Sequence, residues 1–128
     1  MKLLLDTCAL LALAGQTGKL PRRVSHALTS PGQVCVSPIS AWEIAIKVRS
    51  GKLHMGLPPH DWFVKSMERY HLEEIPLDTA LLCAAADLPL LHRDPFDRVL
   101  VATCLAGNFT LLNSNQIIPT YPGMKVIW

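Results

Sequence analysis

Residues 91–106 read LHRDPFDR followed by VLVATCLA, and this stretch couples a dense group of charges to an apolar helical pattern. Asp94 before Pro95 is typical of a helix cap followed by proline in the first turn. Asp97 then falls in that first turn, where the positive end of the helix dipole favours a carboxylate. The residues after Arg98 are almost wholly apolar, so the helix is expected to be buried nearly all round. Asp94 and Asp97 therefore have two interpretations, as helix-capping groups or as members of a binding site.

The composition indicates one well-packed domain. Half of the 128 residues are apolar, 17% are charged, and the net charge is +2. Such a chain is expected to fold as a single domain over residues 1–128 and not to be disordered. The small net charge neither indicates nor excludes a nucleic-acid partner, because a local basic cluster matters more than the sum.

The first residues superficially resemble a signal peptide, since a lysine is followed by three leucines. Asp6 interrupts the apolar run and residues 15–23 are polar, so we expect neither a signal peptide nor a membrane span. The cysteines form no C-x-x-C pair and lie among apolar neighbours. We interpret them as small buried hydrophobes of a reduced, cytoplasmic protein without structural zinc. They are Cys8, Cys35, Cys83 and Cys104.

Short apolar runs alternate with helical patterns along the whole chain. A continuous apolar run such as residues 3–5 is typical of a strand buried on both faces. The alternation predicts an α/β fold with a mostly parallel sheet. The predicted strands cover residues 3–5, 33–36, 72–75, 109–112 and 125–128, and the predicted helices cover 8–14, 21–29, 41–48, 61–69, 79–86 and 99–106.

Three acids are predicted to meet at the carboxyl edge of the sheet, where open α/β sheets bind ligands. Asp6 stands between the first strand and its helix, Glu43 opens the helix after the second strand, and Asp97 is assigned to the same edge. Each acid also has a local explanation. Asp6 or Thr7 can cap a helix, and Ser40 has capping-box spacing to Glu43. One shared acidic pocket explains all three acids better than three separate capping accidents.

A pocket with several carboxylates normally holds a divalent cation, because the carboxylates repel one another. Oxygen ligands favour Mg²⁺ or Mn²⁺, and the absence of a Cys/His ligand set argues against zinc. Lys47 lies four residues after Glu43 on one helical face, so it can pair with that acid or bind a phosphate.

Together these motifs resemble the PIN domain, and within it the VapC-type toxins of type II toxin–antitoxin pairs. No single motif is decisive, but the combination is specific, and it covers nearly the whole chain in order. The matching segments are Leu4-Leu5-Asp6-Thr7, Ser40-Ala41-Trp42-Glu43-Ile44 with Lys47, Gly51-Lys52-Leu53, His92-Arg93-Asp94-Pro95-Phe96-Asp97-Arg98, Tyr121-Pro122-Gly123 and Val126-Ile127-Trp128.

The resemblance implies a three-layer α/β/α sandwich and a metal-dependent endoribonuclease. Asp6, Glu43 and Asp97 match the family's catalytic acids, and Asp94 is a frequent companion. These acids would hold one or two Mg²⁺ or Mn²⁺ ions, which activate water for attack on an RNA phosphodiester. The auxiliary candidates are Thr7, Ser40 and Asn115. Three basic residues are candidates for binding RNA phosphate, and each could equally be a salt-bridge partner of the acids. They are Lys47, Arg93 and Arg98.

One departure from the family pattern concerns Asn113-Ser114-Asn115, where relatives often carry Thr-x-Asp. Asn115 can accept a hydrogen bond or offer a carbonyl oxygen, but it brings no negative charge. We therefore expect weaker metal binding, most clearly at a second ion. The alternative function is a catalytically weak or inactive PIN-like protein that binds RNA or a partner.

Other enzyme classes fit the sequence poorly. A haloacid-dehalogenase-type phosphatase needs a second Asp where Cys8 stands, and a dinucleotide-binding domain needs a Gly-rich turn after the first strand. The expected partners are an RNA substrate, which the sequence does not identify, and a cognate antitoxin whose peptide covers the acidic groove with an Arg or Lys. A homodimer is also expected, and Trp62, Phe63 and Met67 are interpreted as core residues or dimer contacts.

Overall fold

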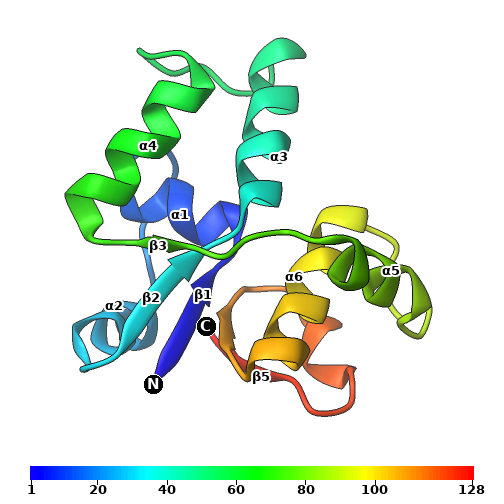
Figure 1. The fold of residues 1–128 in the computed structure, drawn as a ribbon. Coiled ribbons are helices and arrows are strands. Elements are labelled where there is room, and N and C mark those ends of the chain that lie inside the picture. Colours follow the sequence, from blue (N-terminus) through cyan, green and yellow to red (C-terminus); the bar gives the residue numbers. More distant parts are fainter.

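A single five-stranded sheet runs through the protein (Figure 1), and the structure, a computed structural model, describes residues 1–128. The strand order is β3-β2-β1-β4-β5, and every neighbouring pair is parallel. This confirms the predicted α/β class. The elements in chain order are β1 (Lys2–Leu5), α1 (Thr7–Leu13), α2 (Arg22–Thr29), β2 (Gln33–Val36), α3 (Pro38–Arg49), α4 (Pro59–Tyr70), β3 (Glu73–Glu74), α5 (Thr79–Asp87), α6 (Pro95–Gly107), β4 (Thr110–Leu112), the 3₁₀ turn η1 (Ile118–Thr120) and β5 (Lys125–Ile127).

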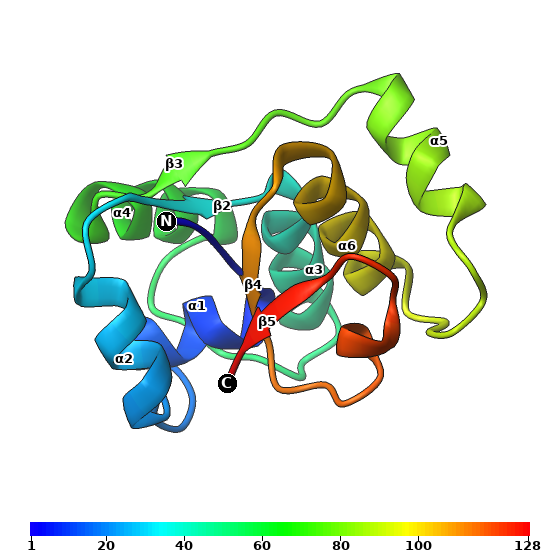
Figure 2. The same cartoon turned by 90° about the horizontal axis from the view of Figure 1, so that it is seen from below.

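The three leucines of the central strand β1 show how the sheet separates two apolar cores. Successive side chains of a strand point to opposite faces. Leu3 and Leu5 join one cluster, which includes residues of α1, α2 and α4, whereas Leu4 joins a second cluster with residues of α5 and α6. Figures 1 and 2 show these helices on the two sides of the sheet. The protein is therefore a three-layer α/β/α sandwich, as predicted.

Helix α6 is the most deeply buried helix, and every residue from Arg98 to Cys104 is buried. This confirms the expected burial up to Leu105, where the helix becomes exposed. The helix follows α5 and leads into β4, so it begins at the carboxyl edge of the sheet and runs back across it. Asp97 thus reaches that edge from a helix-to-helix connection. It lies at the edge predicted for it, but it does not follow a strand as Asp6 does.

Helix α3 begins earlier than the sequence pattern suggests. The Ser37 hydroxyl accepts a hydrogen bond from the backbone N–H of Ile39 at 3.2 Å, and Pro38 occupies the first helical position. Ser40 therefore lies inside the first turn, so it does not form the capping box with Glu43 that its spacing allows. Proline in the first turn needs no amide hydrogen, which explains why the chain can enter the helix at this point.

Two aromatic residues of α4 have a structural role. Trp62 is 7% exposed and Phe63 is 3% exposed, and both pack in the core on the side of α1 and α2. Their burial agrees with the interpretation as core residues and leaves little of either side chain available to a second copy. The only other candidate, Met67, packs against the same core.

The cysteines divide into two groups. Cys35 and Cys104 are buried as predicted, but Cys8 and Cys83 are exposed, and all four are free thiols. No helix has both the length and the apolar character that crossing a bilayer requires.

Candidate metal centre

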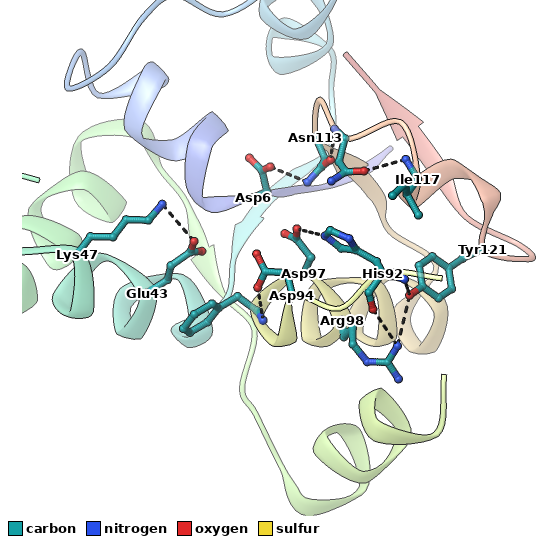
Figure 3. A network of polar contacts seen from close by, with 12 residues as sticks. Asp6, Glu43, Lys47, His92, Asp94, Asp97, Arg98, Asn113, Ile117 and Tyr121 are labelled. Carbon is teal, nitrogen blue, oxygen red and sulfur yellow. Dashed lines mark hydrogen bonds and ion pairs between the residues drawn. The ribbon is translucent and has the colours of Figure 1, made fainter. Parts of the chain in front are cut away.

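A polar cavity of about 220 Å³ opens where β1 and β4 end. It contains four carboxylates and one ammonium group, and Figure 3 shows the carboxylates facing a common space. The cavity brings together most of the predicted site residues, but Ser40, Arg93 and Arg98 do not line it. Its lining consists of Asp6, Thr7, Cys8, Glu43, Lys47, Asp94, Asp97, Asn113, Ser114 and Asn115.

Asp6 lies at the floor of this cavity and is only 5% exposed. It caps helix α1, because its Oδ1 accepts a hydrogen bond from the Ala9 amide at 2.6 Å. Its Oδ2 accepts a second bond, from Nδ2 of Asn113 at 2.7 Å. The two sequence interpretations of Asp6 are thus compatible, since the carboxylate caps a helix and also belongs to the pocket.

Burial raises the pKa of Asp6 to about 7. Removal of the carboxylate from water is the largest cause. The hydrogen bond from Ala9 acts in the opposite direction, while the negative charges of Asp97 and Glu43 raise the pKa further. A buried carboxylate among other acids is stabilised in its charged form by a cation. The donor set therefore fits a divalent ion with oxygen ligands.

Asn113 is the residue that the sequence interpretation overlooked. It follows β4 directly, and the pairing of Leu5 with Leu112 places it beside Asp6, whose amide donates to the Leu112 carbonyl at 3.3 Å. Its side chain is buried, and its Oδ1 accepts from the Asn115 amide at 2.6 Å. The parallel register of the two central strands is the signal that could have identified Asn113.

Asn115 lines the pocket as predicted, but its carbonyl oxygen is already engaged. Its Oδ1 accepts a hydrogen bond from the amide of Ile117 at 2.8 Å. The segment after β4 is therefore a chain of side-chain-to-backbone turns. Asn113 and Asn115 supply amides to the cavity, and neither supplies a charge.

Thr7 and Ser40 form a buried hydroxyl bridge between α1 and α3. The Thr7 hydroxyl donates to the Ser40 hydroxyl at 3.0 Å, and the two residues are 3% and 0% exposed. The pair therefore fixes the distance between the helix that begins beside Asp6 and the helix that carries Glu43. Ser40 acts behind the pocket wall and is a positioning group.

Glu43 and Lys47 form an ion pair on α3, with 3.2 Å between Oε2 and Nζ. Partial burial lowers the pKa of Lys47, but the charge and hydrogen bond of Glu43 outweigh this effect and raise it. Lys47 is therefore firmly cationic. It is the one ammonium group in the pocket, where it offsets part of the negative charge.

Asp97 is held by His92, a residue to which the sequence interpretation gave no role. His92 Nε2 lies 2.7 Å from Asp97 Oδ2, and both side chains are less than a fifth exposed. Burial raises the pKa of Asp97, the hydrogen bond from His92 lowers it, and the charge of Asp94 raises it. Possible ligand atoms of His92, Asp94 and Asp97 lie within 4.8 Å of one another. Asp94 also caps α6 by accepting from the Phe96 amide at 2.9 Å.

Arg98 is only 8% exposed, and both terminal nitrogens of its guanidinium group are bonded within the protein, which argues against a contact with RNA phosphate. It donates to the Tyr121 hydroxyl and to five backbone carbonyls, two in the last turn of α5 and three in the connection from α5 to α6. The carbonyls belong to Ala85, Ala86, Leu88, Pro89 and His92. Arg93, by contrast, is exposed just before Asp94 and stays a candidate for binding phosphate.

We expect Asp6 to destabilise the metal-free protein as the pH rises. The folded-state pKa of about 7 exceeds the reference value of 3.8, so between pH 4 and pH 7 the folded state holds a proton that the unfolded state has released. This difference lowers the free energy of unfolding by up to about 4 kcal/mol. Asp6→Asn should therefore raise the melting temperature at pH 8 in EDTA and have little effect at pH 4. Asp78→Asn, at an exposed cap of α5, is the control, and an equal gain there would contradict the argument.

Replacement of Arg98 tests its structural role. Lysine has three donors in place of the guanidinium fork, so Arg98→Lys leaves at least two of the five carbonyls without a partner. We expect a loss of about 2–4 kcal/mol in the free energy of unfolding, measured by urea denaturation. Arg93→Lys, at the exposed arginine, should change stability by less than about 0.5 kcal/mol. Similar losses in both variants would refute the assignment.

The comparisons with known proteins agree with this geometry. No curated protein sequence gives a significant match. A toxin–antitoxin complex from Klebsiella pneumoniae is similar to the chain with a TM-score of 0.67 and 19% identity, covering 99% of this chain and 97% of that one. VapBC2 from Rickettsia felis, solved with a promoter DNA fragment, has a TM-score of 0.68 and 16% identity, and the match covers 99% of this chain and 98% of that one. FitAcB from Neisseria gonorrhoeae has a TM-score of 0.62 and 15% identity, and the match covers 98% of this chain and 96% of that one.

At these identities the solved structures show a shared fold. The sequence profile of the PIN domain matches residues 3–121, which span nearly the whole chain and include every lining residue of the acidic pocket. The chain therefore belongs to the PIN domain family.

Proposed function

We propose that this protein is a metal-dependent endoribonuclease and the toxin of a toxin–antitoxin pair. The observation that carries the proposal is the buried carboxylate of Asp6, with its pKa raised to about 7 beside Glu43 and Asp97. Such an arrangement is costly for the fold unless a cation compensates it, and strongly perturbed acids in a cleft are typical of functional sites. Membership of the PIN family adds support, because PIN domains of toxins are generally nucleases.

Asp6, Glu43 and Asp97 would hold the metal, with Asp94 at the edge of the same space. Carboxylate oxygens without thiolates favour Mg²⁺ or Mn²⁺. When bound, the ion would activate water and stabilise the negative charge that develops on an RNA phosphodiester. Asp6 is held in place by the Ala9 amide and Asn113, and Asp97 by His92, so both carboxylates are fixed before any ligand arrives.

Lys47 and Arg93 are the proposed contacts to RNA phosphate. Lys47 Nζ lines the pocket and is about a third exposed, so a phosphate can reach it beside its partner Glu43. Arg93 is exposed next to Asp94 and makes no ion pair or side-chain hydrogen bond within the chain. Arginine suits this role because its planar group can contact two phosphate oxygens at once. With RNA as substrate, the protein would act in the cytoplasm.

An antitoxin is the proposed protein partner, as the solved relatives include toxin–antitoxin complexes. Four carboxylates and one ammonium group leave the pocket negatively charged, so a peptide with an Arg or Lys side chain suits it. Two apolar side chains of helix α3 that are close to Glu43 in the sequence are also exposed, Trp42 at 59% and Ile46 at 43%. Trp42 contacts Phe96 edge to face, with 5.3 Å between the ring centroids. A homodimer stays a proposal without an assigned interface.

The second candidate function is binding without cleavage. Asn113 and Asn115 make the wall after β4 neutral, and both are tied into hydrogen bonds within the protein. If a further acid at this wall is needed for a second ion, the protein would bind RNA or its antitoxin and cut slowly or not at all.

RNA cleavage separates the two functions. We expect the wild type to cut single-stranded RNA with Mg²⁺ or Mn²⁺ and to stop in EDTA, and we expect Asp6→Asn and Asp97→Asn to lower the rate by at least about 100-fold. The readout is gel analysis of labelled RNA, with Asp61→Asn, at an exposed position of α4, as the control. Metal-dependent cleavage that survives both substitutions would falsify the site. No cleavage of varied RNAs by a folded wild type would favour the binding-only function.

Restoring an acid at the neutral wall tests the role of Asn115. Asn115→Asp keeps the oxygen that accepts from Ile117 and replaces the side-chain amide nitrogen with a second carboxylate oxygen. We expect Mn²⁺ to bind about tenfold more tightly by calorimetry, and the metal-free melting temperature to fall at pH 8 because of added repulsion. Ser114→Asp, at the exposed neighbour, is the matched control, and equal gains in both variants would rule out a specific role for position 115.

A further inference from the structure

His92 makes a directed contact with an acid of the proposed site. Its Nε2 lies 2.7 Å from Oδ2 of Asp97, and the two side chains are 16% and 18% exposed. Oδ1 of Asp97 makes no hydrogen bond within the chain, whereas both oxygens of Asp6 do. The contact therefore turns one defined oxygen of Asp97 toward His92 and leaves the other toward the cavity (Figure 3).

The backbone of His92 is fixed as firmly as its ring. Its amide donates to the Tyr121 hydroxyl at 3.0 Å, and its carbonyl accepts from Arg98 Nη1 at 3.3 Å. Arg98 also reaches the Tyr121 hydroxyl, at 3.4 Å, and Tyr121 is 1% exposed. Tyr121 and Arg98 thus hold the backbone N–H and C=O of His92, on the two sides of its Cα atom. Because both groups are buried, the position of the imidazole does not depend on solvent.

Arg98 couples this clamp to Asp97 through the chain itself. The two residues are neighbours on α6, so the helix that carries the carboxylate also carries the guanidinium group that holds His92. Leu90 and Leu91 in the connection from α5 are exposed at 87% and 43%, so burial of these two side chains does not hold the connection in place. The buried Arg98 therefore contributes more than stability, because it holds the imidazole of His92 beside Asp97.

We propose that His92 is a positioning residue for Asp97, with Tyr121 and Arg98 holding it so that Asp97 presents Oδ1 to a divalent cation. The inference rests on the proposed metal site and adds a residue to it. Hydrogen bonds to ligating carboxylates orient them and remove rotational freedom that binding would otherwise have to restrict. His92 acts through Asp97 and does not itself bind the ion.

Mn²⁺ binding tests the proposal without any nuclease assay. The free Mn²⁺ signal in electron paramagnetic resonance gives the dissociation constant for wild type, His92→Ala, His92→Gln and Tyr121→Phe. We expect His92→Ala to weaken binding about 10–100-fold, and His92→Gln to recover most of the loss because its amide retains an N–H donor. Tyr121→Phe should shift binding in the same direction by less. His60→Ala, at the exposed start of α4, is the control and should bind as the wild type does.

Two further readouts separate positioning from ligation and from general destabilisation. Pulsed resonance spectra of Mn²⁺ bound to the wild type should lack the coupling of a directly bound nitrogen, and detection of that coupling would overturn the positioning role in favour of ligation. The melting temperature of His92→Gln should stay near that of the wild type. If His92→Ala does not fold, the comparison uses the other two variants. Weakened Mn²⁺ binding by His92→Gln that is no tighter than binding by Tyr121→Phe then counts against the proposal.

The outcomes distinguish this inference from the proposed function. Equal Mn²⁺ affinity in the wild type and His92→Ala overturns the role of His92 and leaves the metal site intact. A wild type that binds no Mn²⁺ overturns both.

Discussion

The burial of one carboxylate, that of Asp6, is the constraint on which the site depends. The group lies where the central strand becomes a helix, and it is 5% exposed. Two hydrogen bonds, from the Ala9 amide and Asn113, compensate part of the loss of hydration. They do not compensate all of it, since desolvation and neighbouring acids still raise the pKa to about 7. The fold therefore carries a destabilising charge at its centre, and a divalent cation would relieve it.

The structure surrounds this charge with rigid supports. The Thr7–Ser40 bridge joins α1 to α3, the Leu5–Leu112 register sets Asn113 beside Asp6, and Arg98 holds the connection that brings His92 to Asp97. The first two supports are buried and join segments that lie far apart in the sequence. Such preorganisation is what a site of mutually repelling acids needs, because unsupported carboxylates would move apart.

The neutral wall after β4 gives the site its individual character. Asn113 carries no charge, but the hydrogen bond that its side-chain amide donates stabilises the charged form of Asp6. Asn115 uses its carbonyl to hold Ile117. Compared with the family pattern of an acid at this wall, the pocket has less repulsion and fewer anionic ligands. The absence of an acid at position 115 is thus expected to weaken the affinity for metal.

The amino-acid sequence by itself determined the alternation of strands and helices, the parallel sheet and the identity of the acids, because apolar periodicity and capping residues are local signals. Asp6, Glu43, Asp94 and Asp97 were predicted correctly as one cluster, and the cavity contains them all. Only the tertiary structure decided what surrounds them. The roles of Asn113, His92 and Arg98 depend on strand register and on a loop folded round a buried guanidinium group. Such contacts join distant segments, and a charged residue looks the same in a sequence whether it is solvated or saturated by carbonyls.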